Sequence, residues 1–214
     1  MINKTLHSAV LLVVICCGQC GPKNNEAETK GDIVTGVSRM RIVSDETLGL
    51  NIYYPDFDRI DLVCGEMPSS EDTNVIFCCE AAFTGQLLST FSHMNIAGNH
   101  VSGGKYFSGY NCRPNTGGFT YDGERWQFFL RNHKAYLMEA AKNGGMGFEQ
   151  NMVIFDGMRQ PLFRKAGSSF EYRTLCELDG ELCVIDSKDV VRYDEYVGRL
   201  LRLGVHNALY LDMG

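Results

Sequence analysis

The sequence predicts one α+β domain built from mixed, largely antiparallel sheets with hairpins, and with two or three helices packed on them. Three Asp-Gly pairs separate short apolar runs in the second half of the chain, and this pattern is a strong signal for tight β-hairpins. Apolar residues with helical spacing lie over 132–142, between the first two pairs, and over 194–203, after the third. Hairpins interleaved with helices are typical of an α+β arrangement. The three pairs are Asp122-Gly123, Asp156-Gly157 and Asp179-Gly180.

The composition is that of an ordinary globular chain. It has 214 residues, of which 44% are hydrophobic and 21% charged, and its formal net charge is −6. A domain of about 180 residues buries roughly 70% of its unfolded surface, so it needs no metal or disulfide to form a core. General nucleic-acid binding depends on Lys and Arg that neutralise phosphates, so the negative charge argues against it. Any phosphate ligand should be bound by a local cluster of donors instead.

The N-terminus has the pattern of an export signal. A short apolar run from Ala9 to Ile15 follows a basic segment, and Cys17 is a candidate for lipidation. We therefore expect a leader over 1–20, a flexible polar tether over 21–31 and a folded domain over 32–214. The expected location is the periplasm or the cell surface as a lipoprotein, with secretion as the alternative. Any membrane contact would be made through the lipid anchor.

The first half of the domain is expected to be mainly strands. The last of these runs is continuously apolar and should be buried. Glu80 follows it directly, and an unpaired buried carboxylate is costly, so Glu80 should either face a site or cap the next turn. The expected strands are 33–43, 51–54, 60–64 and 75–79, followed by a short helix over 83–91.

A polar, glycine-containing stretch over 93–118 is the least regular part of the chain. A loop of this length in a compact domain is usually functional. Its Ser-Gly-Gly-Lys sequence does not have the spacing of a nucleotide-binding loop, but its glycines would let backbone N–H groups approach a phosphate. The histidine spacing is not that of a metal site, and we expect no metal and no cofactor. Candidate substrate contacts here are His93, Asn95, His100, Ser102, Gly103 and Gly104.

Two helices are expected in the second half. Asn132 should cap a helix that runs through Lys142, and Asp194 should cap a second helix. Gly204 follows the second helix and suits the left-handed residue just past a helix end. An apolar strand then runs to Leu211.

The hairpin around Asp179-Gly180 has a predictable register. A two-residue turn places Arg173 opposite Asp186 and Cys176 opposite Cys183. Residues opposite each other in a hairpin are within bridging range, so the register favours this pair if the chain forms a disulfide. The alternative is that both cysteines are buried free thiols, which pack as small apolar groups.

The order of motifs near the C-terminus resembles a known family. After Arg173-Thr174 come the Asp-Gly hairpin, a helix ending in Leu-Gly, an apolar strand and Leu211-Asp212-Met213-Gly214. This order is similar to the C-terminal part of the phosphodiester glycosidases, which include the enzyme that uncovers mannose 6-phosphate by removing N-acetylglucosamine. The resemblance implies an exported hydrolase that cleaves the C1–O bond of a sugar-1-phosphodiester.

That chemistry needs carboxylates to stabilise an oxocarbenium-like transition state and a cation to hold the leaving phosphate. Asp212 and Glu80 are the candidate catalytic carboxylates. Arg173 matches the family's Arg-Thr and is the candidate phosphate clamp, with Thr174 and Gly214 as substrate-binding residues through the same resemblance.

Other interpretations of these residues stay open. Asp212 could only form a turn, and Arg173 could only make an ion pair with Asp186. A Cys79 nucleophile activated by His100 would make the protein a cysteine hydrolase, although nothing in the local sequence activates that thiol.

A non-catalytic function is the main alternative. Ala81, Ala82 and Met213 stand where the family has glycines. The chain could therefore be a surface protein that binds glycans or phosphoglycans on the same scaffold without cleaving them.

Overall fold

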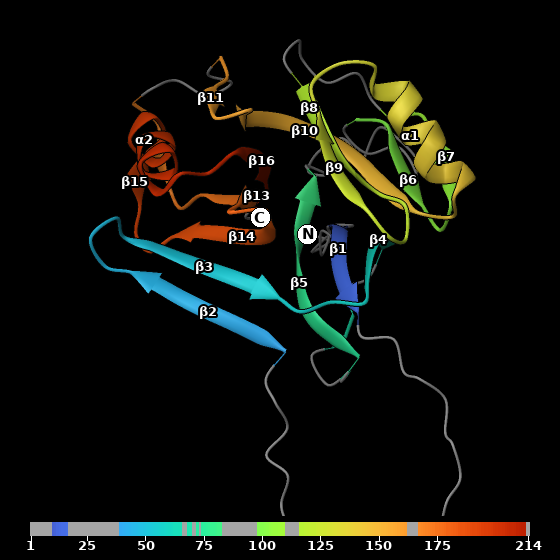
Figure 1. Cartoon of the computed structure of the whole chain (residues 1–214), viewed down its shortest axis with the longest axis horizontal. Coiled ribbons are helices and arrows are strands. Elements are labelled where there is room, and N and C mark those ends of the chain that lie inside the picture. Colours follow the sequence, from blue (N-terminus) through green and yellow to red (C-terminus); the bar gives the residue numbers. More distant parts are fainter. Residues whose placement is uncertain are drawn as a thin grey trace, which may run out of the picture.

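The strands of this computed structural model pair antiparallel throughout the described ranges, and two helices pack on the sheets (Figure 1), so the predicted α+β class is confirmed. The helices are α1 (His133–Lys142) and α2 (Tyr193–Leu203). The structure describes residues 10–16, 39–65, 68–69, 72, 74–82, 98–109, 116–161 and 167–212.

Most strands belong to one large sheet. Its order is β2-β3-β14-β13-β16-β10-β6-β7; β8 and β11 also pair with β10, and β9 pairs with β8. The strands are β2 (Met40–Asp45), β3 (Leu50–Pro55), β6 (His100–Ser102), β7 (Lys105–Phe107), β8 (Thr116–Tyr121), β9 (Trp126–Phe129), β10 (Met146–Phe155), β11 (Met158–Arg159), β13 (Arg173–Leu178), β14 (Glu181–Ser187) and β16 (Asn207–Leu211).

A three-stranded sheet has the order β4-β1-β5, with β1 (Val10–Cys16), β4 (Arg59–Gly65) and β5 (Val75–Ala82). β1 contains the apolar run that we expected in the leader, and its backbone pairs with both neighbours. Cleavage of a leader would remove β1 and leave the facing edges of β4 and β5 unpaired. The leader, the tether and the export stay predictions. Among the described residues, no helix combines the length and apolar character that a membrane crossing requires. A two-stranded ladder joins β12 (Ser169–Phe170) to β15 (Val191–Arg192).

β10 connects the two halves of the molecule. Its first part pairs with β8 and β6, and its second part pairs with β16 and β11. Figure 1 shows the half with α2 on one side of this strand and the half with α1 on the other. Gly147 lets the strands approach here, because a Cβ at this position would lie 2.7 Å from the Thr120 side chain and 2.8 Å from Leu137.

The hairpin between β13 and β14 has the predicted register. Asp179 and Gly180 form its turn with φ values of 53° and 79°, as a type I′ turn requires. Both predicted opposite pairs are present, Arg173 with Asp186 and Cys176 with Cys183, and Leu178 stands opposite Glu181.

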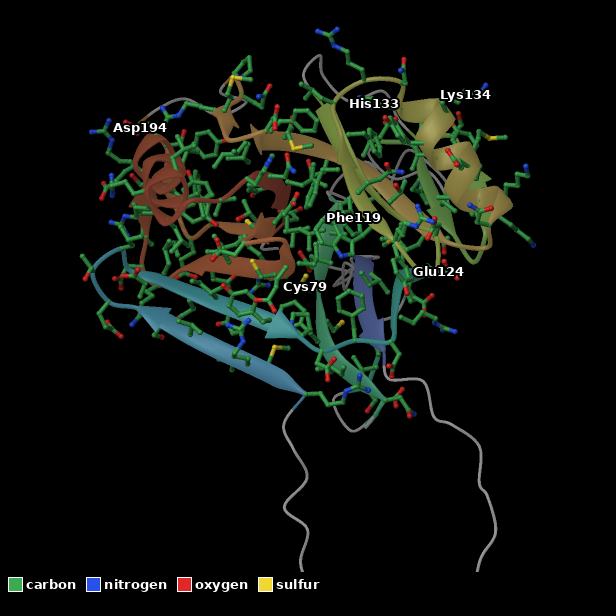
Figure 2. All side chains as sticks on the ribbon, viewed as in Figure 1. Cys79, Phe119, Glu124, His133, Lys134 and Asp194 are labelled. Carbon is green, nitrogen blue, oxygen red and sulfur yellow. The ribbon has the colours of Figure 1, made fainter. Side chains whose placement is uncertain are left out.

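The two faces of this hairpin border different cores. Leu175 and Val184 belong to a cluster shared with β4 and β5, whereas Cys176 and Cys183 belong to a cluster shared with α2. Because side chains alternate along a strand, Arg173 shares the face of Leu175. Figure 2 shows Cys79 and Phe119 in the interior, and both belong to the first cluster.

Both helices begin differently from the prediction. Asn132 precedes α1 but has a left-handed backbone with φ 55° and makes no side-chain cap. α2 begins before Asp194, and that carboxylate pairs with Arg192 at 2.8 Å instead of capping. Gly204 ends α2 with φ 91°, as predicted.

Part of the predicted irregular stretch is regular. Residues 100–107 form the hairpin of β6 and β7, and Gly103 and Gly104 make its turn with positive φ. The predicted helix over 83–91 and the first part of the strand predicted over 33–43 lie outside the described residues.

Candidate functional site

Three of the predicted site residues come together although they lie on separate strands. Arg173 is the first residue of β13 and stands opposite Leu211 of β16, so Asp212 follows directly beside it. β5 packs against β16 and carries Glu80 near its end. The C-terminal end of β16, the start of β13 and the end of β5 therefore meet at one place, which we call the acidic centre: Glu80, Asp212 and Arg173.

The charges of the acidic centre act on Glu80. Burial raises the pKa of Glu80, the Asp212 carboxylate raises it further, and the Arg173 guanidinium lowers it in part. The net effect is a raised pKa, so Glu80 keeps its proton to a higher pH than a solvated glutamate. Two carboxyl groups with a proton held on one of them are what a general acid beside an ionised carboxylate requires.

Arg173 makes the cross-strand ion pair that the register predicts. Its Nε and Nη2 donate to Asp186 at 2.7 and 2.6 Å. Hydrogen bonding to Asp186 holds the pKa of Arg173 above its usual range, so it stays charged. Within the described residues Nη1 makes no hydrogen bond.

The prediction that Thr174 contacts a substrate is wrong. Thr174 is fully buried on the face toward α2, because strand alternation turns it away from Arg173. Its hydroxyl lies 2.8 Å from the Tyr196 hydroxyl, which itself donates to the Ile185 carbonyl at 2.8 Å. Thr174 therefore fastens α2 to the sheet.

His100 lies in the core and not at the surface. It is fully buried and stacks on Phe107 with ring centroids 5.1 Å apart. Burial lowers the pKa of His100, against smaller raising effects from the Gly98 backbone and Glu149, so the ring is neutral at physiological pH. Neither ring nitrogen makes a hydrogen bond that satisfies both distance and angle within the described part. The prediction that His100 contacts a substrate is therefore wrong for this structure.

The other predicted loop contacts are not brought to the acidic centre either. Ser102 donates its hydroxyl to the Leu62 carbonyl at 2.7 Å, which joins β6 to β4. Gly104 lies against Gly144, because a Cβ added to it would be 3.2 Å from the Gly144 Cα. The turn of Gly103 and Gly104 is thus at the end of α1. His93, Asn95 and Gly214 lie outside the described residues.

The cysteines do not have the character of nucleophiles. Burial raises the pKa of the Cys79 thiol to about 12, and only 3% of the residue is exposed. Such a thiol stays protonated at neutral pH, which argues against the cysteine hydrolase. Cys176 and Cys183 stand opposite each other as predicted, and both are buried free thiols.

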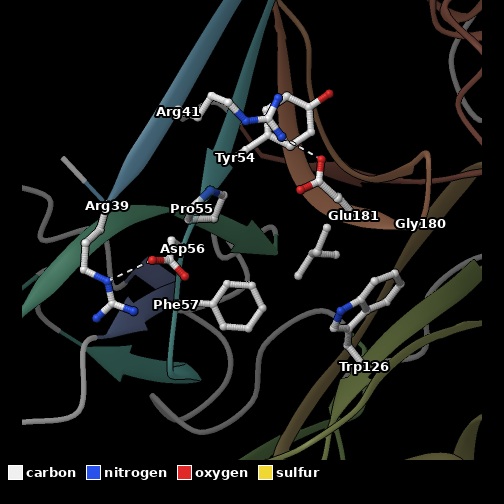
Figure 3. A pocket seen from close by; sticks show the side chains of 10 residues that line it. Arg39, Arg41, Tyr54, Pro55, Asp56, Phe57, Trp126, Gly180 and Glu181 are labelled. Carbon is white, nitrogen blue, oxygen red and sulfur yellow. Dashed lines mark hydrogen bonds and ion pairs between the residues drawn. The ribbon is translucent and has the colours of Figure 1, made fainter. Parts of the chain in front are cut away.

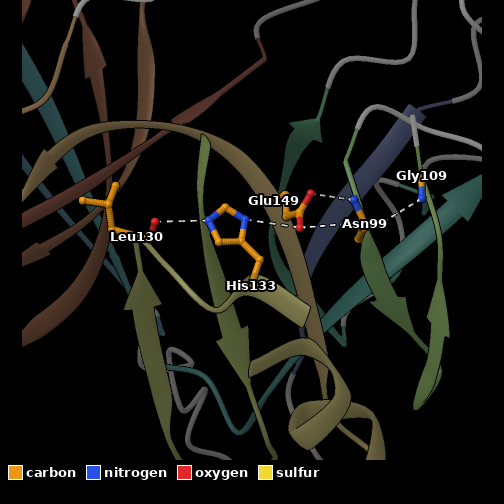
Figure 4. Close-up of polar contacts among 5 residues, drawn as sticks. All are labelled: Asn99, Gly109, Leu130, His133 and Glu149. Carbon is orange, nitrogen blue, oxygen red and sulfur yellow. Dashed lines mark hydrogen bonds and ion pairs between the residues drawn. The ribbon is translucent and has the colours of Figure 1, made fainter. Parts of the chain in front are cut away.

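A buried network that the sequence analysis missed holds β10 to α1 (Figure 4). Glu149 accepts hydrogen bonds from the Asn99 backbone at 2.9 Å and from the Asn99 side chain at 2.8 Å, and His133 lies 3.3 Å away. Burial alone would raise the pKa of Glu149, but these hydrogen bonds outweigh it and lower the pKa. Since each oxygen has partners, the network is a structural anchor. The residues are far apart in the sequence, so no local pattern could have indicated it.

A second missed feature is a pocket of about 430 Å³ beside the β13–β14 turn (Figure 3). It is lined by aromatic and charged residues from β2, β3, β9 and β14, and it does not include the acidic centre. In the described part of the chain, no three or more His, Cys, Asp and Glu side chains are grouped as a metal ion would require.

In comparisons with protein-family models, with curated proteins and with solved structures, nothing matched this chain.

Proposed function

We propose that the protein is an exported hydrolase that cleaves the C1–O bond of sugar-1-phosphodiesters at the acidic centre. The observation that carries the proposal is the meeting of Glu80, Asp212 and Arg173, whose charges act on one another. Two carboxyls and one guanidinium are the groups that this reaction needs. The similarity of the C-terminal motifs to phosphodiester glycosidases supports the same reaction.

Each member of the acidic centre has a distinct role in this mechanism. Asp212 faces C1 of the sugar and stabilises the positive charge that develops as the C1–O bond breaks. The bond electrons leave with the phosphate oxygen, and Arg173 stabilises the resulting phosphate through Nη1. Glu80 holds a proton for the leaving oxygen and takes one from the water that completes hydrolysis at C1.

The raised pKa of Glu80 gives the reaction a pH dependence. The protonated acid is the competent form, and the pKa of Glu80 lies above its ordinary value of 4.5. Activity should therefore fall as the pH rises through the pKa of Glu80. In Asp212→Asn the repulsion that raises this pKa is lost, so the fall should move to lower pH.

Release of free sugar from N-acetylglucosamine-1-phosphate diesters and from UDP-sugars tests the proposal. We expect Asp212→Asn and Glu80→Gln each to lower kcat/KM by about 10²–10⁴-fold. Asp156→Asn is the matched control, because Asp156 lies in an exposed turn with φ 54°, a conformation that asparagine also adopts. Unchanged activity in Asp212→Asn would remove Asp212 from the mechanism.

The ion pair of Arg173 with Asp186 favours a second candidate function. Two of its hydrogen bonds go to Asp186, so the pair could serve only to hold the hairpin together. The protein would then be a surface glycan- or phosphoglycan-binding protein on the same scaffold. Saturable binding of sugar phosphodiesters without release of sugar, at any pH, would favour this candidate over the hydrolase.

A further inference from the structure

The pocket beside the β13–β14 turn has an apolar floor. Trp126 of β9 and Phe57 lie at its base, and both pack against the core shared with β4 and β5. Phe57 is held edge-on against Tyr121 with ring centroids 6.2 Å apart, and Trp126 is held edge-on against Phe128 at 6.1 Å. The aromatic floor is therefore pre-formed and needs no rearrangement to receive a ring.

The rim of the pocket consists of charged side chains that are already paired. Arg41 lies over the Tyr54 ring, 3.6 Å from its centroid, and donates to Glu181 at 2.6 Å. Arg39 contacts Asp56 at 3.4 Å (Figure 3) and Asp58 at 2.8 Å. These pairs fix the orientation of the side chains, and Arg41 and Glu181 keep further N–H donors and carboxylate lone pairs for a ligand.

The charge balance of the rim restricts the ligand. Among the described residues that line the pocket, Arg39 and Arg41 are matched by two carboxylates, Asp56 and Glu181, so these side chains have no excess of positive charge. A phosphate or carboxylate ligand would therefore gain no net electrostatic attraction from these four side chains. A neutral ligand with both donors and acceptors fits this rim better.

The volume also restricts the ligand. About 430 Å³ is near the lower end of the roughly 300–1,000 Å³ of small-molecule sites. It is enough for one or two small rings and too little for a large cofactor.

We propose that this pocket binds a neutral saccharide through one pyranose ring. The apolar C–H face of the ring would lie on Trp126 and Phe57, and its hydroxyl groups would exchange hydrogen bonds with Arg41 and Glu181. A saccharide has the required combination, because it presents an apolar face together with hydroxyls that both donate and accept.

The pocket is separate from the acidic centre. Leu182 lines the pocket, and Asp186, which holds Arg173, comes four residues later on β14, roughly 13 Å away at ~3.3 Å per residue. The inference does not depend on the proposed function. A glycan hydrolase could use the pocket to hold a remote part of its substrate, and a glycan-binding protein could use it as a primary site.

Trp126 is the only tryptophan of the chain, so tryptophan fluorescence reports directly on ligand binding in the pocket. Tryptophan emission of the full-length protein is titrated with glucose, galactose, mannose and N-acetylglucosamine, and with adenosine as a stacking ligand of a different class. We expect a saturable change with at least one saccharide and none with adenosine. Isothermal titration calorimetry with the same sugar measures Kd independently of the fluorescence.

Two variants locate the binding. Arg41→Met removes rim donors but keeps an apolar stem over Tyr54, and Phe57→Ala removes part of the floor. Each should weaken binding about tenfold, as the loss of one good contact predicts. The controls are Arg202→Met, on the surface of α2, and Phe170→Ala, whose side chain is 51% exposed and outside the pocket.

Arg41 is 53% exposed, so Arg41→Met keeps the test interpretable if Phe57→Ala fails to fold. The proposal is overturned if no saccharide in the panel changes the emission or produces binding heat. It is also overturned if adenosine binds and the sugars do not, or if both pocket variants bind the sugar with the affinity of the unmodified protein.

Discussion

Replacing Asp186 with asparagine tests how much the ion pair with Arg173 contributes to the fold. The side chains are 23% exposed for Arg173 and 11% for Asp186, so most of the pair is shielded from water. Removing one partner of a fully buried pair costs about 3–5 kcal/mol, whereas an exposed pair contributes about 0–1 kcal/mol. Because the arginine keeps some contact with water, we expect Asp186→Asn to lower the free energy of unfolding by about 2–3 kcal/mol.

Differential scanning calorimetry and urea unfolding measure this loss. One kcal/mol shifts Tm by about 2–4 °C in a domain of about 150–250 residues, so the expected decrease is roughly 4–12 °C. A double-mutant cycle with Arg173→Met isolates the coupling between the two side chains. Glu195→Gln is the control, because it breaks the pair of Glu195 with Arg199 on the surface of α2, which should contribute no more than about 0.5 kcal/mol.

A small effect would refute the reasoning. If Asp186→Asn costs less than about 1 kcal/mol, or if the coupling energy is near zero, water solvates the guanidinium and the pair does not hold Arg173 in place. The assignment of Nη1 to a ligand would then lose its geometric basis.

Glu80→Gln should raise Tm at neutral pH and leave it unchanged well below pH 4.5. The folded protein holds the Glu80 proton more tightly than the unfolded chain, so the folded protein loses stability as the pH rises from the ordinary pKa of 4.5 through the raised pKa. Glutamine cannot ionise, so the variant avoids this loss. An equal or lower Tm of Glu80→Gln at neutral pH would contradict this. Tyr196→Phe should cost about 1–3 kcal/mol, since it removes the hydrogen bonds of the Tyr196 hydroxyl with the buried Ile185 carbonyl and Thr174 hydroxyl. Urea unfolding with no loss would show that water replaces the hydroxyl. Cys79 in the folded protein should react with iodoacetamide at least about a hundredfold more slowly than a free thiol, because it is buried and its pKa is about 12. Rapid labelling of Cys79, followed by peptide mass spectrometry, would show that the strand opens.

The parts of the fold that follow local rules could be predicted from the sequence. The register of β13 and β14 needs only the two-residue turn at Asp179-Gly180, and the end of α2 needs only the left-handed Gly204. Arg173 and Asp212 lie side by side because β13 pairs with β16, and both of these strands were predicted from the sequence.

Features that depend on distant contacts could not be predicted. A polar residue in a glycine-rich stretch gives no sign that it is buried, yet His100 lies in the core because β10 pairs with β6. The position of Thr174 is a different case, because strand alternation is a local rule that already turns its side chain to the face opposite Arg173. The pocket brings together residues from four strands, so its floor and rim have no local signature.

The pairing of β3 with β14 affects how the chain can acquire its structure during synthesis. Ile52 stands opposite Ile185, so β3 can pair with β2 early but has no partner on its other edge until β14 has been made. Long-range pairing of this kind slows folding and prolongs the exposure of open strand edges. The nascent chain therefore remains incompletely folded until β14 has emerged from the ribosome, and until then one edge of β3 is open to pairing with other chains.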